Sequence, residues 1–372
     1  MSQKSTHITD LFGTLPTPSY IIDENVLRHN GEILASVAAH TGCKILLAQK
    51  AFSNYDFYPL LSGYLSGTEA SGLYEARLGA EEMPDKEVHV FCGAYRDDEF
   101  EELLTYADHI VFNSPHQFKK FAQKAKAAGK SIGLRINPEC STQDGHAIYD
   151  PCAPGSRLGT TRAVWNREMT GEWISLLDGL HFHTLCEQDS DDLETTLAAV
   201  ERSFGDILPQ MKWLNMGGGH HITRNDYDIA RLEKCITYAQ DQWNLCVYLE
   251  PGEAVALNAG YLITRVLDIV ENNGTHIAIL DTSAACHMPD VIEMPYMPPL
   301  YGAKAVTDKP ATNADSKHPD FVYRLAGPTC LAGDVIGDYT FATPLHEGSL
   351  LVFQDMAIYS TCKNNTFNGM PL

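Results

Sequence analysis

The chain has few basic residues and no long hydrophobic run, and these shortages exclude several classes of protein. Among its 372 residues, Lys and Arg number 27 against 48 for Asp and Glu, so the formal net charge is −21. A nucleic-acid binder needs basic surface to displace phosphate counterions, and docking on an anionic membrane needs it too. Because no stretch of about 18 apolar residues occurs, we expect no membrane-spanning helix.

Signals for export and for disulfide bonding are also lacking. The first ten residues are polar and contain no apolar segment of the kind found in signal peptides. The ten cysteines include no Cys-x-x-Cys pair, and a chain of this length does not need disulfides to form a core. We therefore expect free thiols and a cytoplasmic protein.

What the sequence does contain, from residue 43 onward, is an alternation of short apolar runs and helical patterns. This alternation is typical of parallel βαβ units. Eight strands and the absence of an early Gly-x-Gly-x-x-Gly favour a (β/α)8 barrel over a doubly wound sheet. The expected strands are Cys43–Lys50, Gly67–Ser71, Val88–Gly93, His109–Asn113, Ile132–Asn137, Gly179–Thr184, Trp213–Gly217 and Cys246–Glu250. The expected helices are Asn25–His40, Tyr55–Tyr64, Leu73–Glu82, Asp97–Tyr106, Pro115–Ala128, Asp192–Leu208 and Tyr227–Gln242.

After Gly252 the pattern changes to that of an antiparallel β domain. We therefore predict a barrel over residues 23–255, a β domain over 256–372, and an N-terminal segment, 1–22, that joins the β domain. Two stretches rich in Pro read as loops, Pro138–Thr161 and Met288–Pro310, and a loop as long as the first is usually functional. The expected strands of the β domain are Tyr261–Val270, His276–Asp281, Phe321–Leu325 and Ser349–Phe353, preceded in the chain by Ser19–Ile22.

Chemically active residue types follow the barrel strands, where barrel enzymes carry their active sites. Lys50 is either a strand-end lysine whose stem covers apolar surface or an amine suited to Schiff-base chemistry. Three successive glycines, Gly217–Gly219, let backbone amides approach an anion, although a tight turn would also use them. The strand-end residues are Lys50, Ser71, Arg135, His183, Gly217, Gly218, Gly219 and Glu250.

Two further motifs allow more than one interpretation. His181 and His183 are spaced i, i+2 and share a strand face; with Cys186 and Glu187 they could bind a metal, or His183 could stack on a flat ring. Cys330 follows a Gly-Pro-Thr turn and precedes Asp334, so it is either a proton donor or a small buried hydrophobic residue.

In their order along the chain, these motifs resemble the pyridoxal-phosphate decarboxylases of the alanine-racemase fold, the family of ornithine, arginine and diaminopimelate decarboxylases. The similarity covers nearly the whole chain. It rests on Ala48-Gln49-Lys50-Ala51, Phe182-His183, Met216-Gly217-Gly218-Gly219, Glu250-Pro251-Gly252, Gly327-Pro328-Thr329-Cys330 with Asp334, Asp355-Met356-Ala357-Ile358-Tyr359 and Thr366-Phe367-Asn368-Gly369.

The resemblance implies that the cofactor is pyridoxal 5'-phosphate and assigns residues to it. Lys50 would bind it covalently, and His183 would stack on its ring. Gly217–Gly219 and Tyr359 would bind its phosphate, and Glu250 would pair with its ring nitrogen. A carboxylate there favours decarboxylation over racemisation, because a protonated ring accepts electrons more fully.

The resemblance also implies a homodimer with shared sites and a cationic substrate. Cys330 of the partner subunit would protonate the α-carbon, and Asp334 of the partner subunit would hold the substrate's distal amine. We expect a carboxylated polyamine, with Asp290 and Glu293 as further candidates for binding its amines, although a solvated loop would also carry such acids.

One residue departs from the common pattern of the family. Relatives commonly have Arg after Glu-Pro-Gly, where it binds the phosphate, whereas this chain has Glu253. The Glu-Pro-Gly-Glu-Ala variant resembles the branch that acts on carboxylated polyamines. Arg157 and Arg135 are candidates for replacing the arginine by charge alone.

The sequence leaves three alternatives to a carboxylated-polyamine decarboxylase. They are the same chemistry on diaminopimelate, ornithine or arginine, a metal-dependent barrel hydrolase, and a non-catalytic pyridoxal-phosphate-binding barrel.

Overall fold

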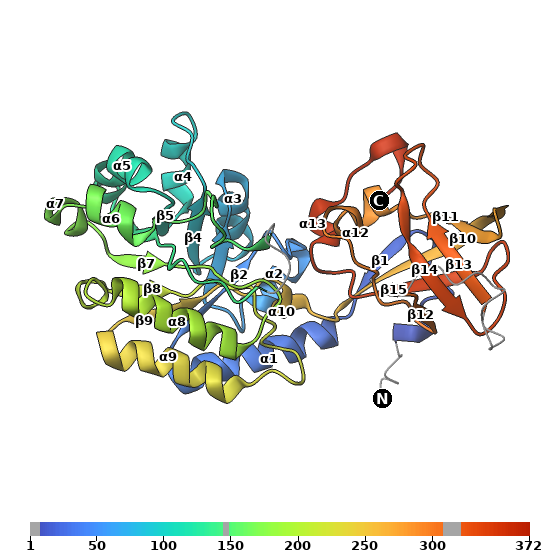
Figure 1. Cartoon of the computed structure of the whole chain (residues 1–372), viewed down its shortest axis with the longest axis horizontal. Coiled ribbons are helices and arrows are strands. Elements are labelled where there is room, and N and C mark those ends of the chain that lie inside the picture. Colours follow the sequence, from blue (N-terminus) through green and yellow to red (C-terminus); the bar gives the residue numbers. More distant parts are fainter. Residues whose placement is uncertain (1–7, 144–148, 308–320) are drawn as a thin grey trace. The chain divides into compact units, whose positions relative to one another are not determined.

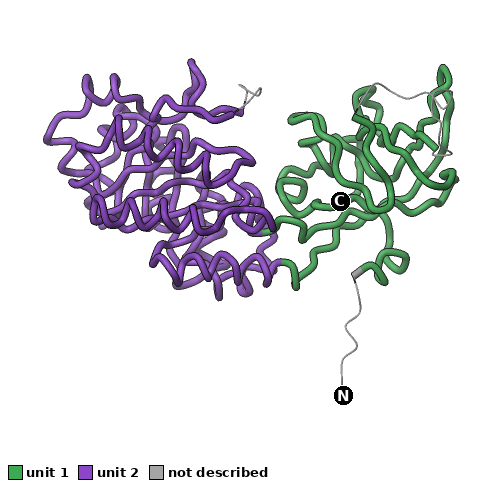
Figure 2. The backbone as a smooth tube through the Cα atoms, turned by 60° about the horizontal axis from the view of Figure 1, so that its bottom comes forward, with its two compact units in different colours: residues 1–26, 256–372 green, residues 27–255 purple. Residues whose placement is uncertain are grey.

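The chain folds into two compact units, which Figure 2 colours separately. The computed structural model describes residues 8–143, 149–307 and 321–372. One unit comprises Met1–Val26 and Ala256–Leu372, and the other comprises Leu27–Val255 (Figure 2). The first strand of the chain thus belongs to the same unit as the C-terminal third.

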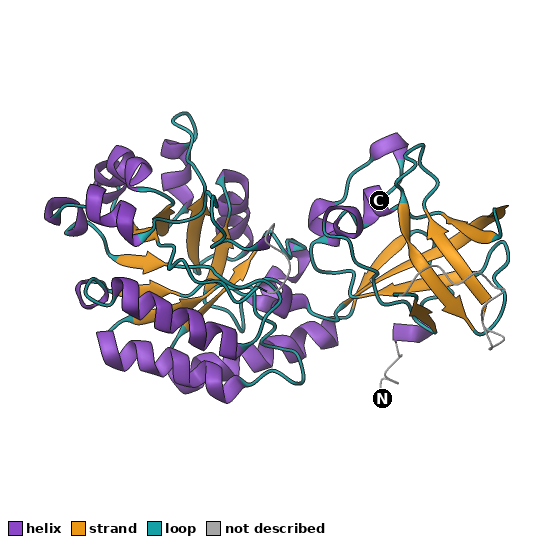
Figure 3. Cartoon of the chain, viewed as in Figure 1, coloured by secondary structure: helices purple, strands orange, loops and turns teal. Residues whose placement is uncertain are grey.

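The second unit is a closed barrel of eight parallel strands with helices packed around it (Figures 1 and 3). Strands pair in chain order, and the last closes on the first through Lys44 opposite Tyr248 and Ile45 opposite Leu249. The predicted (β/α)8 barrel is therefore confirmed. Its strands are β2 (Lys44–Ala48), β3 (Gly67–Ala70), β4 (Glu87–Cys92), β5 (His109–Phe112), β6 (Ser131–Arg135), β7 (Gly179–His181), β8 (Trp213–Asn215) and β9 (Cys246–Leu249). The helices are α1 (Glu24–Thr41), α2 (Tyr58–Leu61), α3 (Leu73–Glu82), α4 (Phe100–Tyr106), α5 (Pro115–Ala127), α6 (Arg162–Glu168), α7 (Gly171–Ile174), α8 (Ser190–Phe204), α9 (Ile229–Trp243) and α10 (Glu253–Ala256).

A tryptophan fills the barrel interior because two neighbouring strands have glycine beside it. A Cβ on Gly179 would lie 2.0 Å from the ring of Trp213, and a Cβ on Gly133 would lie 2.3 Å from it. The indole nitrogen donates to Ser131 Oγ at 2.9 Å. The large side chain is thus buried with its polar atom satisfied, as such interiors require.

Local signals fix where several barrel helices begin and end. The Ser114 side chain accepts from the amide of Gln117, and Pro115 occupies the first position of α5, which are both common at helix starts. Asp189 and Asp192 form a capping box at the start of α8. Asn244, with a φ of 55°, ends α9 in the left-handed conformation.

The segment between β6 and β7 begins with the expected irregular loop, since no α-helix or strand of the structure falls within the described residues of Pro138–Thr161. Asn113 holds this segment, donating to the carbonyl of Arg157 at 2.8 Å and accepting from the amide of Gly159 at 2.7 Å. Helices α6 and α7 follow it, and the sequence patterns did not predict them, because they are short. Residues 144–148 of the predicted loop lie outside the described residues.

The other unit contains a sheet with the order β1-β10-β11-β13-β14-β12, and β15 also pairs with β10. The predicted antiparallel β domain is confirmed, since its strands pair antiparallel except for one parallel pair, β11 and β13. Its strands are β1 (Ser19–Ile22), β10 (Gly260–Asn272), β11 (Thr275–Leu280), β12 (Ala303–Ala305), β13 (Phe321–Ala326), β14 (Val335–Phe341) and β15 (Leu350–Gln354). Its helices are α11 (Ala284–His287), α12 (Asp290–Glu293) and α13 (Ser360–Lys363).

The expectation of a loop over Met288–Pro310 is also wrong in part. Within it, α12 forms one helical turn and β12 pairs antiparallel with β14. Strand β14 was not predicted, since its Gly and Asp weaken the strand pattern. Residues 308–310 of the predicted loop lie outside the described residues.

The ten cysteines are all free, as expected. In the described part of the chain, every helix is too short or too polar to cross a membrane.

Candidate active site

Glu250 lies directly after β9, and its carboxylate accepts hydrogen bonds from two side chains of the neighbouring strands β7 and β8. Its Oε2 accepts a hydrogen bond from His181 Nε2 at 3.0 Å, and its Oε1 accepts one from Asn215 Nδ2 at 2.5 Å. Burial raises the pKa of Glu250, but His181 and the hydrogen bond from Asn215 lower it by more. The pKa of Glu250 therefore falls below its ordinary value. The buried carboxylate is therefore ionised at neutral pH and aimed by two donors.

His181 is neutral and supports this carboxylate from within the barrel. Burial lowers the pKa of His181 despite the neighbouring Glu250, so the ring donates through Nε2 without carrying a charge. Its ring lies against Phe91, with centroids 5.4 Å apart. Arg135 lies over the same Phe91 ring at 4.5 Å and donates to the carbonyl of His183 at 3.0 Å.

The three glycines pass so close to other backbone that no side chain would fit. A Cβ on Gly217 would lie 2.6 Å from the carbonyl oxygen of Phe182, and one on Gly218 or Gly219 would lie 2.0 Å from the carbonyl of Glu250 or Leu185. Gly217 and Gly219 also have φ of 69° and 85°, where glycine is favoured. The segment is therefore a close-packed backbone cradle.

His183 is oriented by that cradle. Its Nδ1 accepts a hydrogen bond from the amide of Gly218 at 2.9 Å, which fixes the plane of the ring. Burial, with the charges of Lys50 and Arg135, holds the pKa of His183 well below its ordinary value. A neutral imidazole in a fixed plane is suited to stacking on an aromatic ring.

Lys50 lies in the turn after β2, and its side chain is exposed. The amine of Lys50 is therefore not buried, whereas we expected a desolvated amine for Schiff-base chemistry. The preceding Gln49 is fully buried and donates to the carbonyl of Glu75 at 2.8 Å. The turn that carries Lys50 is thus fixed to the barrel while the amine stays accessible.

Glu69 is a buried acid that sequence reasoning missed. It lies on β3, is 5% exposed, and burial together with the charge of Glu250 raises its pKa well above the ordinary value. Its carboxyl therefore keeps its proton to a higher pH than an ordinary glutamate does. The signal in the sequence was a Glu inside the predicted strand Gly67–Ser71.

In the other unit, Cys330 lies on a loop that Asp334 closes. Asp334 is 2% exposed; its Oδ2 accepts from the Thr329 hydroxyl at 2.6 Å and its Oδ1 from the amide of Ala285 at 3.3 Å. The amide of Cys330 donates to Asn368 Oδ1 at 3.0 Å, and the thiol-bearing side chain is exposed. Asp334 thus shapes the loop, and its contact with a substrate amine stays a prediction.

The remaining predicted residues lie in the same unit as Cys330. Asp290 and Glu293 are on α12, and both form ion pairs with Lys363 of α13. Tyr359 precedes α13 with a φ of 54°, which is strained for a bulky residue. Such strain is most often found at functional sites.

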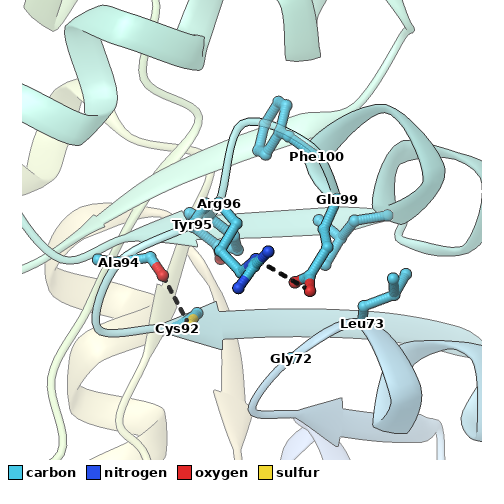
Figure 4. A pocket seen from close by; sticks show the side chains of 9 residues that line it. Gly72, Leu73, Cys92, Ala94, Tyr95, Arg96, Glu99 and Phe100 are labelled. Atoms are coloured by element: carbon cyan, nitrogen blue, oxygen red, sulfur yellow. Dashed lines mark hydrogen bonds and ion pairs between the residues drawn. The ribbon is translucent and has the colours of Figure 1, made fainter.

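Two other features of the described barrel are separate from these residues. Glu87, His89 and His109 have ligand atoms within 4.8 Å of one another. Glu87 and His109 are the first residues of β4 and β5, at the opposite ends of the strands, and His89 is the third residue of β4. A cavity of about 100 Å³ lies beside Cys92, Tyr95 and the Arg96–Glu99 ion pair, and Figure 4 shows the side chains that line it. Ligand pockets usually enclose about 300 Å³ or more, and no predicted site residue lines this cavity.

The residues described above fit a phosphorylated aromatic cofactor. The three glycines carry no side chains, so their backbone amides can approach an anion such as a phosphate group. At the same end of the barrel, His183 offers a flat ring and Glu250 an ionised carboxylate. A family model described as "pyridoxal-dependent decarboxylase, C-terminal sheet domain" matches residues 19–357.

The chain belongs to the pyridoxal-dependent decarboxylase family.

Individual relatives within this family have more specific names. A carboxynorspermidine/carboxyspermidine decarboxylase of Campylobacter jejuni is 43% identical over 96% of this chain and 92% of its own. A carboxyaminopropylagmatine decarboxylase of Synechocystis is 40% identical over 96% and 88%. The crystal structure of carboxynorspermidine decarboxylase from Campylobacter jejuni, complexed with norspermidine, has a TM-score of 0.86 and 42% identity, covering 96% and 92%.

Family membership decides which class of reaction applies among the alternatives that the sequence left open. The protein is a decarboxylase, and therefore a lyase, whose cofactor is pyridoxal phosphate. The alternative of a metal-dependent hydrolase built on His181 and His183 is not supported, since His181 is bound to Glu250 and His183 to Gly218. Asn215, which bridges Glu250 and the amide of Gly217, is a further residue that the sequence patterns did not reveal.

Proposed function

We propose that the protein removes the carboxyl group of carboxynorspermidine or carboxyspermidine and releases norspermidine or spermidine. The observation that carries the proposal is the 42–43% identity, over 96% of the chain, to a decarboxylase of this name and to its norspermidine complex. The acidic chain, with its net charge of −21, is compatible with a polycationic substrate.

In this proposal, seven residues hold the cofactor, which supplies the electron sink for decarboxylation. Lys50 anchors it covalently, His183 lies against its ring, and Gly217–Gly219 with Tyr359 bind its phosphate. Glu250 keeps the ring nitrogen protonated, because His181 and Asn215 hold its carboxylate ionised. The chain thus places a fixed negative charge where the bound ring needs it.

The proposal gives Cys330 the task of returning a proton to the α-carbon. Its side chain is exposed, while its backbone is fixed by Asn368 and the loop closed by Asp334. We propose that the thiol serves the active site of a second copy, so that the enzyme works as a homodimer. Mixing Lys50→Ala with Cys330→Ala tests this, since hybrid dimers regain one intact site, whereas independent sites would leave the mixture no more active than the Cys330 variant alone.

We further propose that acids contact the amine arm of the substrate. Asp290 and Glu293 are candidates whose charge Lys363 already balances in part, so we expect a substrate ammonium to share or displace that lysine. Asp334 is the third candidate. Replacing Asp290 and Glu293 by Asn and Gln would then raise KM for a triamine substrate, and an unchanged KM would remove both from the proposal. A cytoplasmic location remains part of the proposal.

A second candidate substrate is carboxyaminopropylagmatine, favoured by the 40% identity to the Synechocystis enzyme of that name. It ends in a planar guanidinium instead of an ammonium group. Measuring kcat/KM for CO2 release from carboxynorspermidine, carboxyspermidine, carboxyaminopropylagmatine, diaminopimelate, ornithine and arginine separates these possibilities. We expect the first two to be preferred. A preference for carboxyaminopropylagmatine would select the second candidate, and a preference for diaminopimelate, ornithine or arginine would contradict both.

A further inference from the structure

The proposed phosphate cradle has an acid beside it. The turn that leads to Glu253 packs against Gly218, whose Cβ would lie 3.3 Å from Pro251 N. The thiol of Cys186, next to Gly219, experiences the charges of both Glu253 and Lys50, which places Glu253 at the same end of the barrel as Lys50. A carboxylate here would repel a phosphate group unless a cation compensated for it.

His221 is the group in position to compensate. Its Nε2 lies 2.6 Å from Glu253 Oε2, and the two side chains are only 14% and 16% exposed. The segment that carries it is tied to the cradle, because the amide of His221 donates to Gln188 and the amide of Gln188 to Gly219. Within the described residues, its Nδ1 makes no hydrogen bond, so a second N–H is available on a protonated ring.

The surroundings of this imidazole favour the protonated form. Burial lowers the pKa of His221, but the hydrogen bond and charge of Glu253, with the charge of Glu187, raise this pKa above its ordinary value. Arg224 opposes protonation, yet it is itself paired with Asp189 and Asp226. Burial lowers the pKa of the neighbouring His220 to about 4, so that ring is neutral.

We propose that His221, held by Glu253, is the cationic group that binds the cofactor phosphate in this chain. The inference rests on the proposed function of Gly217–Gly219. Nε2–H donates to Glu253, and Nδ1–H of the protonated ring would donate to a phosphate oxygen of the bound cofactor. The two arginines suggested by charge are less suitable, because Arg135 is committed to His183 and Phe91 and Arg157 is exposed.

A pH dependence follows from this arrangement. The positive charge of His221 is present below its raised pKa and is lost as the pH rises through it. We therefore expect affinity for pyridoxal phosphate to fall as the pH rises through this raised pKa, which lies above the ordinary histidine value. Affinity for pyridoxal, which has no phosphate, should not follow that change.

The test measures the Kd of the apoenzyme for pyridoxal phosphate and for pyridoxal, by absorbance, as a function of pH. His221→Gln keeps a hydrogen-bonding group next to Glu253 but removes the charge. We expect it to weaken pyridoxal phosphate binding roughly tenfold to a hundredfold at neutral pH, the usual range for a charged hydrogen bond, and to leave pyridoxal binding unchanged. Glu253→Gln should move the pH midpoint of the affinity change downward.

A matched control is His40→Gln, which disrupts another His–Glu pair, with Glu233 at 2.8 Å, on the barrel helices α1 and α9. If His221→Gln binds pyridoxal phosphate as tightly as His40→Gln does, the inference is wrong. If the variants do not fold, the wild-type apoenzyme still provides the test. An equal pH dependence of its Kd for pyridoxal phosphate and for pyridoxal would overturn the inference. A wild-type apoenzyme that binds neither ligand would instead contradict the proposed function.

Discussion

Replacing His181 by Phe tests whether decarboxylation depends on the donors beneath Glu250. The substitution keeps an aromatic ring against Phe91, where the wild-type centroids are 5.4 Å apart. It removes the Nε2–H donor that lies 3.0 Å from the carboxylate. A hydrogen bond to a charged group contributes about 1.5–3 kcal/mol, which corresponds to roughly a tenfold to 150-fold change in an equilibrium.

We expect kcat to fall by about that factor at neutral pH while the cofactor stays bound. The sign of the pH effect follows from the depressed pKa of Glu250. Its carboxylate acts above that pKa and is lost as the pH falls through it. Losing a donor raises the pKa, so the acidic limb of the kcat profile should move to higher pH. The assay is CO2 release at saturating substrate and pyridoxal phosphate across the pH range.

His109→Phe is the matched control. His109 is another partly buried barrel histidine, stacked on His89 at 3.9 Å, but it lies on the first residue of β5, at the opposite strand ends. We expect it to change Tm without moving the acidic limb. An acidic limb and kcat that stay at wild-type values in folded His181→Phe would refute the reasoning, and equal losses in both variants would assign the effect to general packing.

Three further predictions concern single positions. Lys50→Ala should abolish the absorbance near ~420 nm expected of the covalently bound cofactor; persistence of the band would show that another residue carries it. Cys330→Ala should slow turnover or divert it to side products while that absorbance remains, and unchanged turnover and product would remove the thiol from the reaction. Gly218→Ala, whose Cβ would lie 2.0 Å from the Glu250 carbonyl, should destabilise the fold by about 1–3 kcal/mol and weaken cofactor binding. Gly93→Ala, where the Cβ would meet nothing within 4 Å, should do neither, and equal Tm values for these two variants would contradict the cradle geometry.

The barrel was predictable because its signals are local. Most of the eight strands are apolar runs between helical patterns, although β3 is Gly-Thr-Glu-Ala. Leu73–Glu82 is a helix with the predicted ends. Short elements were not predictable in this way. Helices α6 and α7 and strand β12 contain seven, four and three residues, too few for a period to appear. The parallel pairing of β11 with β13 depends on contacts far apart in the chain.

Residues that act through other residues were the hardest to find from sequence. Glu250 was conspicuous at a strand end, but Asn215 and His181 acquire a role only because β7, β8 and β9 lie side by side. The same holds for His221, whose partner Glu253 is 32 residues away in sequence. The resemblance to the family showed that Glu253 stands where relatives commonly have a phosphate-binding arginine, and our proposal for His221 addresses what replaces that arginine.

The central claim is that this chain uses Glu250 and pyridoxal phosphate to decarboxylate a carboxylated polyamine. The most direct test is to incubate the purified holoenzyme with carboxynorspermidine and to quantify CO2 and norspermidine together, with Lys50→Ala as the blank. The account predicts one norspermidine for each CO2, a dependence on added cofactor after its removal, and no product in the blank. Racemised substrate without CO2, or full release of CO2 by the Lys50 variant, would contradict it.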